Sequence, residues 1–302
     1  MLSLQTNIAS LAAQGSLGVT NKTLTTSMTR LSTGFRVNSA MDDAAGLQIA
    51  TRLTAQTRGQ QVAQRNTQNA ISMMQTAEGA LNEVSDMLIR MKDLATQAAD
   101  ASSSVNDQAA MQAEYDALGE QLNQIMNNTT FGGMNLLSTT NLAPNQGIFA
   151  AGPVQFQIGS TSAEKYSLNV SANTSGLNTA LAAISAAYAT PGTAGTEIGD
   201  AAATQSANAT SANAKIDTLA SALDTVGKVR SALGAAGNRL DHVFNNLTSM
   251  VQNTTAAKGR IMDTDYASES ATMTTKQMLM QAGTSMLKQA NGMSQLALSL
   301  MQ

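Results

Sequence analysis

Residues 216–251 read IDTLASALDTVGKVRSALGAAGNRLDHVFNNLTSMV, and this stretch decides the fold class. Its seam residues recur at alternating steps of three and four over five heptads, which is typical of a helix that packs along a partner helix. The seam consists of Ile216, Leu219, Leu223, Val226, Arg230, Leu233, Gly237, Leu240, Phe244, Leu247 and Val251. Only Arg230 and Gly237 interrupt its apolar character. The stretch therefore predicts a long, coiled-coil-like helix.

Comparable seams occur toward both ends of the chain. A first helix is expected to stop near Gly34, because glycine readily adopts the left-handed conformation that closes helices. Its partner-facing residues are Leu4, Ile8, Leu11, Leu17, Leu24 and Leu31. A second heptad series comprises Leu279, Met286, Met293 and Leu300. We expect these two seams to pair with each other and with further copies of the chain.

The region between the first helix and the middle of the chain is also expected to be helical. Residues 35–58 are interpreted as an ordered connection with a short helix, in which Asp42 and Asp43 serve as turn residues. One carboxylate pair is a poor cation site. A long helix is expected from Gln60 to about Asp100 along Val62, Asn66, Asn69, Met73, Ala77, Leu81, Val84, Leu88, Met91, Ala95 and Ala98. A further helix should begin near Val105, and a turn at residues 131–133 should follow it.

The middle of the chain has a different composition. Residues 138–213 are mostly Gly, Ser, Thr, Asn and Ala. Alternating apolar residues at 154–158 and 166–170 predict a β-hairpin, and Leu177, Leu181 and Ile184 predict a short helix. Residues 190–213 are interpreted as a surface loop, because they look too small and polar to bury a core.

The overall composition limits the class of protein. The 302 residues include 18 Met, no Trp and no Cys, and the net charge is −3. Ala and Met suit helices packed side by side. The charge gives no reason to expect nucleic acid, and the absence of Cys excludes disulfides and thiolate chemistry. We identify no cleavable secretory signal and no 18-residue apolar stretch that would insert in a membrane.

Catalytic motifs are not found. The single histidine, His242, cannot form a histidine-based metal set and is interpreted as an interface or solvated residue. Ser285 and Lys288 have the spacing of a serine nucleophile motif, but its companion motifs are missing. Asp263 and Asp265 are interpreted as the acidic start of the last helix. The sequence therefore predicts no enzyme, no cofactor and no metal.

Several longer motifs resemble those of bacterial flagellin. In the first half they are RLSTGFRVNSA (30–40), DDAAGL (42–47), QTAEGAL (75–81) and FGGMNLL (131–137). In the second half they are LGA (233–235), NRL (238–240), RIMDTD (260–265) and QAN (289–291). Together with the seams they cover about three quarters of the chain. The resemblance implies a secreted, extracellular subunit that self-polymerises into the helical filament of the bacterial flagellum.

The resemblance also implies a domain organisation for this mainly α fold. Residues 1–40 and 260–302 would form a terminal coiled-coil core domain, and residues 41–137 and 214–259 a helical bundle domain. Residues 138–213 would be a variable surface segment with a β-hairpin and a loop. The large outer domains of longer flagellins would be missing. The ten partner-facing residues of the two terminal seams are then the expected filament-core packing residues.

The resemblance further implies partners. They are other copies of the chain, the flagellar export apparatus and its chaperone, and the filament cap and junction proteins. Arg90, Leu94 and Glu114 correspond to the surface by which Toll-like receptor 5 recognises some flagellins, although Arg90 and Glu114 could simply form a surface ion pair.

Three other classes of protein share some of these sequence features. A flagellar hook–filament junction protein would share both terminal patterns but polymerise poorly by itself. A helical signalling or adhesion module would explain the heptads but not the seams at both ends. A peptidase, known among flagellins with inserted metal motifs, conflicts with the single histidine.

Overall fold

The structure is a computed structural model that describes residues 7–138 and 147–299, with side chains described through residue 292. Over these residues the chain is mainly helical, as the sequence predicts, with two small antiparallel strand pairs, of which the second is the predicted hairpin. The helices are α1 (Ile8–Thr33), α2 (Ala44–Ala98), α3 (Val105–Asn128), α4 (Ile148–Ala151), α5 (Ser171–Ile184), α6 (Ala186–Ala189), α7 (Gln205–Met262) and α8 (Tyr266–Ser299). The strands are β1 (Thr130–Phe131), β2 (Met134–Asn135), β3 (Val154–Gln157) and β4 (Lys165–Leu168).

Contacts within the chain divide it into two compact units. Unit 1 consists of residues 1–58 and 251–302, and unit 2 consists of residues 59–250. The long helices α2 and α7 each contribute to both units. The three-part domain organisation inferred above rests on the sequence and remains a prediction.

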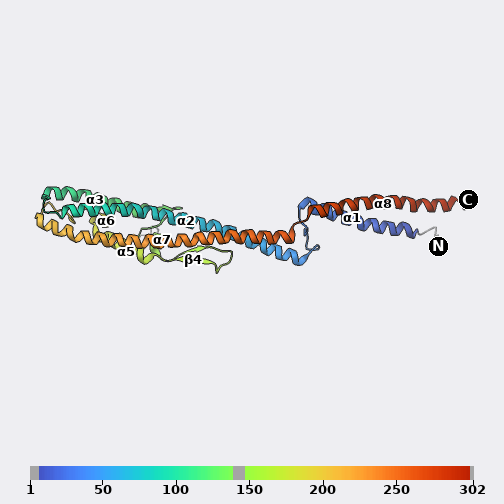
Figure 1. Ribbon diagram of the computed structural model, residues 1–302, viewed down its shortest axis with the longest axis horizontal. Coiled ribbons are helices and arrows are strands. Elements are labelled where there is room, and N and C mark those ends of the chain that lie inside the picture. Colours follow the sequence, from blue (N-terminus) through green and yellow to red (C-terminus); the bar gives the residue numbers. More distant parts are fainter. Residues whose placement is uncertain (1–6, 139–146, 300–302) are drawn as a thin grey trace. The chain divides into compact units, whose positions relative to one another are not determined.

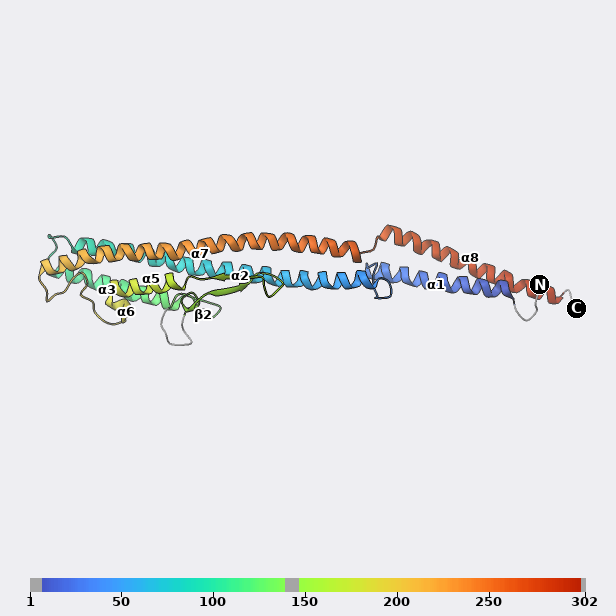
Figure 2. The same ribbon diagram turned by 90° about the horizontal axis from the view of Figure 1, so that it is seen from below.

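Unit 1 is built on the pairing of α1 with α8, which lie side by side in Figures 1 and 2. The first helix ends where the sequence predicts, because Gly34 adopts a left-handed φ of 75° and its N–H bonds to the carbonyl of Arg30. The last helix begins after Asp265, whose carboxylate accepts hydrogen bonds from the N–H groups of Ala267 and Ser268. The acidic start expected for this helix is therefore confirmed.

Six threonines along α1 share one hydrogen-bond pattern. Each donates its hydroxyl to the carbonyl oxygen four residues earlier, at distances of 2.8–3.0 Å. The six residues are Thr20, Thr23, Thr25, Thr26, Thr29 and Thr33. Because these donors use main-chain acceptors of their own helix, they do not require water as a partner.

The interpretation of residues 35–58 as a connection with a short helix is wrong. The long helix α2 already begins at Ala44 and continues without a break through residue 58. Asp43 caps it by accepting a hydrogen bond from the N–H of Gly46 at 2.8 Å, and Asp42 accepts from the N–H groups of Asn38 and Ser39. Both aspartates are therefore turn and capping residues, as expected. No proline interrupts residues 44–98, and the two mid-helix glycines, Gly59 and Gly79, are tolerated, so the helix has no local reason to end.

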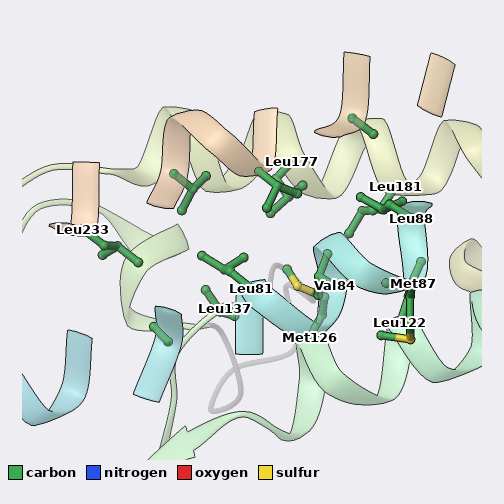
Figure 3. Packing of buried hydrophobic residues seen from close by; sticks show 14 of the residues in the cluster. Leu81, Val84, Met87, Leu88, Leu122, Met126, Leu137, Leu177, Leu181 and Leu233 are labelled. Carbon is green, nitrogen blue, oxygen red and sulfur yellow. The ribbon is translucent and has the colours of Figure 1, made fainter. Parts of the chain in front are cut away.

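Unit 2 has a continuous hydrophobic core between α2, α3, α5 and α7 (Figure 3). Its largest fully buried side chains include Leu81, Leu88, Met91, Tyr115, Leu122, Met126, Leu177 and Leu181. These residues come from α2, α3 and α5, and Leu219, Val226, Leu233 and Leu240 of α7 close the core at seven-residue intervals. The seam predicted from Met73 to Ala98 is confirmed as buried at each of its positions.

Two parts of the predicted seams are displaced by one residue. Before Met73, α2 buries Ala63, Thr67 and Ala70 instead of Val62, Asn66 and Asn69. In α7 the positions between the leucines are Ala222, Val229 and Ala236, not Leu223, Arg230 and Gly237. Positions three and four residues apart lie on the same side of a helix, so a seam displaced by one residue keeps the same spacing and only the partner helix selects which of the two sets is buried.

The middle segment is more structured than its composition suggests. The β-hairpin is confirmed, with Val154 opposite Leu168 and Gln157 opposite Lys165. The short helix is confirmed as α5. The interpretation of residues 190–213 as a surface loop is wrong, because α7 begins at Gln205 and the side chain of Ile198 is fully buried.

Polar side chains of α3 hold this part of the middle segment. Gln112 accepts hydrogen bonds from the N–H groups of Ile198 and Gly199, and Asp116 accepts one from Gly195. Tyr115 is buried and donates its hydroxyl to the carbonyl of Ile184 at 2.9 Å. Burial raises the pKa of Tyr115, with a further rise from the nearby carboxylates of Glu197 and Asp116. The segment is thus anchored by hydrogen bonds that local composition does not reveal.

Candidate assembly and recognition surfaces

The two terminal helices of unit 1 pair in an antiparallel arrangement. Near one end, the side-chain amide of Asn7 donates to the carbonyl of Ala290 at 2.9 Å. Near the other end, Arg30 lies 3.9 Å from the carboxylate of Glu269. Contacts between residues so far apart in sequence confirm the expected pairing of one helix near the start with another near the end of the chain. An ion pair at this distance and partial exposure contributes about 0–1 kcal/mol, so apolar packing must supply most of the stability.

Three of the predicted seam residues on α1 face α8. Leu24 is buried, and Leu17 and Leu31 are half-buried at the same heptad position. Leu17 lies against Gly283, where a β-carbon would be only 3.0 Å from the Leu17 side chain. Glycine at position 283 therefore permits the closest approach of the two helices.

Four predicted seam residues do not face the partner helix. The exposed fractions are 74% for Ile8, 69% for Leu11, 49% for Leu279 and 69% for Met286. In α8 the half-buried positions that follow steps of three and four are instead Glu269, Met273, Lys276, Met280, Gly283, Leu287 and Ala290. The predicted positions Leu279 and Met286 thus lie one residue before the half-buried Met280 and Leu287, and α1 packs against a set of residues that also includes Gly283 and Ala290.

The other three predicted seam residues have no described side-chain position. Leu4 and Leu300 lie outside the described residues, and Met293 belongs to α8 but its side chain is not described. We call the exposed set Ile8, Leu11, Leu279 and Met286 the apolar face of unit 1.

The residues expected to contact a receptor lie in unit 2. Both Nε and Nη2 of Arg90 donate to one carboxylate oxygen of Glu114, at 2.8 and 2.6 Å, which joins α2 to α3. The two side chains are 54% and 46% exposed. Leu94 is only 2% exposed and belongs to the hydrophobic core. The structure thus brings Arg90 and Glu114 together at the surface and places Leu94 beneath it.

The residues considered for catalysis are not organised as a site. His242 is exposed on α7, and the hydroxyl of Ser285 donates to the carbonyl of Gln281 in its own helix. Within residues 7–138 and 147–299, no group of three or more His, Cys, Asp or Glu side chains could hold a metal ion. The helices in the same part of the chain include none with the length and apolar character needed to cross a membrane.

The comparisons with known proteins concern both halves of the chain. The family model of the bacterial flagellin N-terminal helical region matches residues 4–142, and that of the C-terminal helical region matches residues 196–301. A flagellin of Halalkalibacterium halodurans is 37% identical over 297 residues, which cover 98% of each chain. Flagellin D of Vibrio anguillarum is 32% identical over an aligned length of 374 residues, covering 99% of each chain.

A solved structure supports the fold alone. The structure of a putative flagellar hook-associated protein from Vibrio parahaemolyticus has a TM-score of 0.56 and 15% sequence identity. The match covers 74% of this chain and 100% of that chain.

A folded helical core in one unit, together with large apolar side chains left exposed in the other, is typical of a subunit that associates with other protein chains. The family matches give that class a specific identity: the chain belongs to the bacterial flagellins. It is a structural subunit that self-polymerises into the filament of the bacterial flagellum, and it is not an enzyme.

Proposed function

We propose that the apolar face of unit 1 is buried against neighbouring copies in the filament, while Leu17, Leu24 and Leu31 pair the two terminal helices within each copy. The observation that carries this proposal is the exposure of Ile8, Leu11, Leu279 and Met286 beside a seam that is already paired. Leu4, Met293 and Leu300 extend the same heptad series and belong to the proposed packing set.

Burial of the apolar face of unit 1 would contribute to the free energy of assembly. Complete burial of one large apolar side chain contributes about 1.5–3 kcal/mol. The four described residues are half to three-quarters exposed, so their burial supplies several kcal/mol per subunit before the ordering cost is subtracted. Contacts between two different surfaces repeat without closing and generate a helical polymer.

Seeded polymerisation tests this proposal. We expect Ile8→Ser and Met286→Ser to raise the critical concentration for filament growth at least tenfold, the effect of losing about 1.4 kcal/mol per contact. Met41→Ser is the matched control, since Met41 is 94% exposed but lies in the turn before α2. Normal growth of both seam variants would contradict the proposed packing.

Receptor recognition is proposed for the surface formed by Arg90 and Glu114. Their half-exposed ion pair, in which two Arg90 nitrogens donate to one Glu114 oxygen, presents neighbouring positive and negative charges across α2 and α3. Leu94 would support this surface from the core and would not touch the receptor. We expect Arg90→Ala and Glu114→Ala to reduce signalling by purified monomer in cells that carry Toll-like receptor 5, with little change in thermal stability. Unchanged signalling by both variants would remove these residues from the proposed site.

Secretion to the cell exterior and contacts with the export apparatus, its chaperone, and the filament cap and junction proteins are also proposed. They rest on the family membership of the chain. Comparison of culture supernatants from export-competent and export-deficient cells tests the secretion step, and equal amounts of the protein in both would contradict it.

The alternative function as a hook–filament junction protein is favoured only by the fold likeness to a hook-associated protein. Flagellins that align along almost the whole chain favour the filament subunit. The seeding assay separates the two functions, because a junction protein would not extend long filaments.

A further inference from the structure

Methionine is the residue type through which an oxidant would act on this protein. The chain contains 18 Met but no Cys and no Trp, so no thiol or indole ring competes for the oxidant. A peroxide converts the methionine thioether to a sulfoxide, which turns a flexible apolar side chain into a polar one. Because the oxidant comes from the solvent, the exposure of each methionine decides how readily it reacts.

Exposure separates the described methionines into two groups. Those in the core of unit 2 are at most 8% exposed, and they are Met73, Met74, Met87, Met91 and Met126. Those that are more than half exposed lie outside that core, and they are Met28, Met41, Met134, Met278 and Met286. A peroxide in solution therefore meets the second group in the folded protein, while the core stays shielded.

Among the described residues, Met286 is the exposed methionine that belongs to the apolar face of unit 1. It is 69% exposed on α8. Met273 and Met280 of the same helix are half-buried and belong to the set of residues that packs against α1. Oxidation of Met286 can therefore change the outer surface of unit 1 without removing a contact between α1 and α8.

The reaction transfers one oxygen atom from the peroxide to sulfur. A lone pair of Sδ of Met286 attacks one oxygen of hydrogen peroxide, so that an S–O bond forms and the O–O bond breaks. The leaving hydroxide takes the proton of the transferred hydroxyl group. Sulfur is oxidised, the peroxide is reduced, and the products are the sulfoxide and water.

A sulfoxide at this position is unfavourable in a packed interface. Its oxygen accepts hydrogen bonds from water in the free subunit. The other members of the apolar face, Ile8, Leu11 and Leu279, have side chains without hydrogen-bond donors. A polar group that is buried without a partner costs free energy, which opposes the gain from burial of the methionine side chain.

We propose that Met286 is an oxidation site at which a peroxide converts the free subunit into a form that does not assemble. The inference rests on the proposed burial of the apolar face of unit 1 in the filament. Oxidation acts on the free subunit, in which the side chain is exposed, and leaves the α1–α8 pair and the core of unit 2 folded. Enzymatic reduction of the sulfoxide restores the thioether and with it assembly.

Peroxide treatment of monomers followed by seeded growth tests this site. The unsubstituted protein, Met286→Leu and Met41→Leu are treated with hydrogen peroxide, catalase removes the excess, and mass spectrometry measures the sulfoxide at each methionine. The critical concentration of each treated protein is divided by that of the same protein before treatment, so any effect of the leucine itself cancels. Met41 provides the matched control, because it is 94% exposed but lies outside the apolar face.

The ratio of critical concentrations is expected to depend on position 286. It should be at least about tenfold for the unsubstituted protein and for Met41→Leu, and below about twofold for Met286→Leu. The other exposed methionines react alike in the compared proteins, so the difference isolates Met286. Methionine sulfoxide reductases that act on both sulfoxide epimers should remove the effect, and the Tm of the oxidised monomer should be unchanged.

Three results would overturn the proposal. They are equal ratios in all three proteins, a monomer that carries no sulfoxide at position 286, and a lowered Tm that shows unfolding as the cause of poor growth.

The Met286→Ser variant, without peroxide, separates this inference from the packing on which it rests. Poor growth of Met286→Ser together with normal growth of the unsubstituted protein oxidised at position 286 would overturn the oxidation site and leave the packing intact. Normal growth of Met286→Ser would instead remove Met286 from the packing set, and the oxidation site would fall with it.

Discussion

Unit 1 and unit 2 are both built on long helices, but they differ in how much of the apolar surface of those helices is buried. Unit 2 surrounds its core with α2, α3, α5 and α7, and many of its large apolar side chains are fully buried. Among the residues of unit 1 whose exposure is described, the buried hydrophobic ones are Leu24, Val37 and Ala50. In a pair of helices only one side of each helix is buried, whereas in a bundle several sides of a helix can be buried against different neighbours. The number of neighbouring helices, not the strength of the heptad pattern, therefore decides which unit is complete in a single copy.

The largest effect is expected when a buried leucine side chain is removed from each unit, which leaves a cavity. Leu88→Ala removes a fully buried side chain of unit 2 and should lower the free energy of unfolding by about 2–5 kcal/mol. Leu24→Ala in unit 1 should leave the main unfolding transition of the monomer nearly unchanged. Urea denaturation followed by circular dichroism measures both, and equal losses would show that the two units fold as one.

Overpacking of the terminal pair should have the next largest effect. Gly283→Leu introduces a side chain where a β-carbon alone already lies 3.0 Å from Leu17, and it should weaken the α1–α8 pairing by about 1–3 kcal/mol. The loss should appear as faster proteolysis within residues 8–33 of the monomer. Gly292→Leu is a control, because a β-carbon there meets no atom within 4 Å.

Removal of one buried hydroxyl tests the anchoring of the middle segment. Tyr115→Phe leaves the carbonyl of Ile184 without its donor and should cost about 1–2 kcal/mol. Hydrogen exchange should increase in α5 and α6 but not in unit 1. Protection that is unchanged throughout would show that this bond does not hold the segment.

The smallest effect is expected at the start of α3 and should depend on pH. The hydroxyl and N–H of Ser104 hold the pKa of Asp107 below its usual value of 3.8, so this contribution to stability is present above that pH and is lost as pH falls through the lowered pKa. Ser104→Ala should cost about 1 kcal/mol at pH 7. A titration by nuclear magnetic resonance should show the pKa of Asp107 returning toward 3.8 in the variant, and an unchanged pKa would contradict the assigned cause.

The sequence was sufficient to predict that the long helices exist, although not where α2 and α7 begin, and to predict the hairpin and the pairing of the two terminal helices. Seven-residue repeats such as Leu17, Leu24 and Leu31 indicate which side of a helix packs against a partner. The choice between Leu279 and Met280, or between Arg230 and Val229, could not be made, because residues one position apart both lie near the seam and only the partner helix selects one. Nothing near Gln60 in the sequence indicates that its side-chain amide is buried without a hydrogen-bond partner among the described residues, since the residues that surround it lie about 100 and 180 positions away in the chain.

The six threonines along α1 have a consequence for dehydration. A hydroxyl that loses water without another partner makes transfer into a dry interface unfavourable. Here each hydroxyl donates to a carbonyl of its own helix in the single copy, and that bond does not change when solvent is removed. The surfaces of α1 that carry these threonines can therefore enter a closely packed interface with little water without leaving any of these donors unsatisfied.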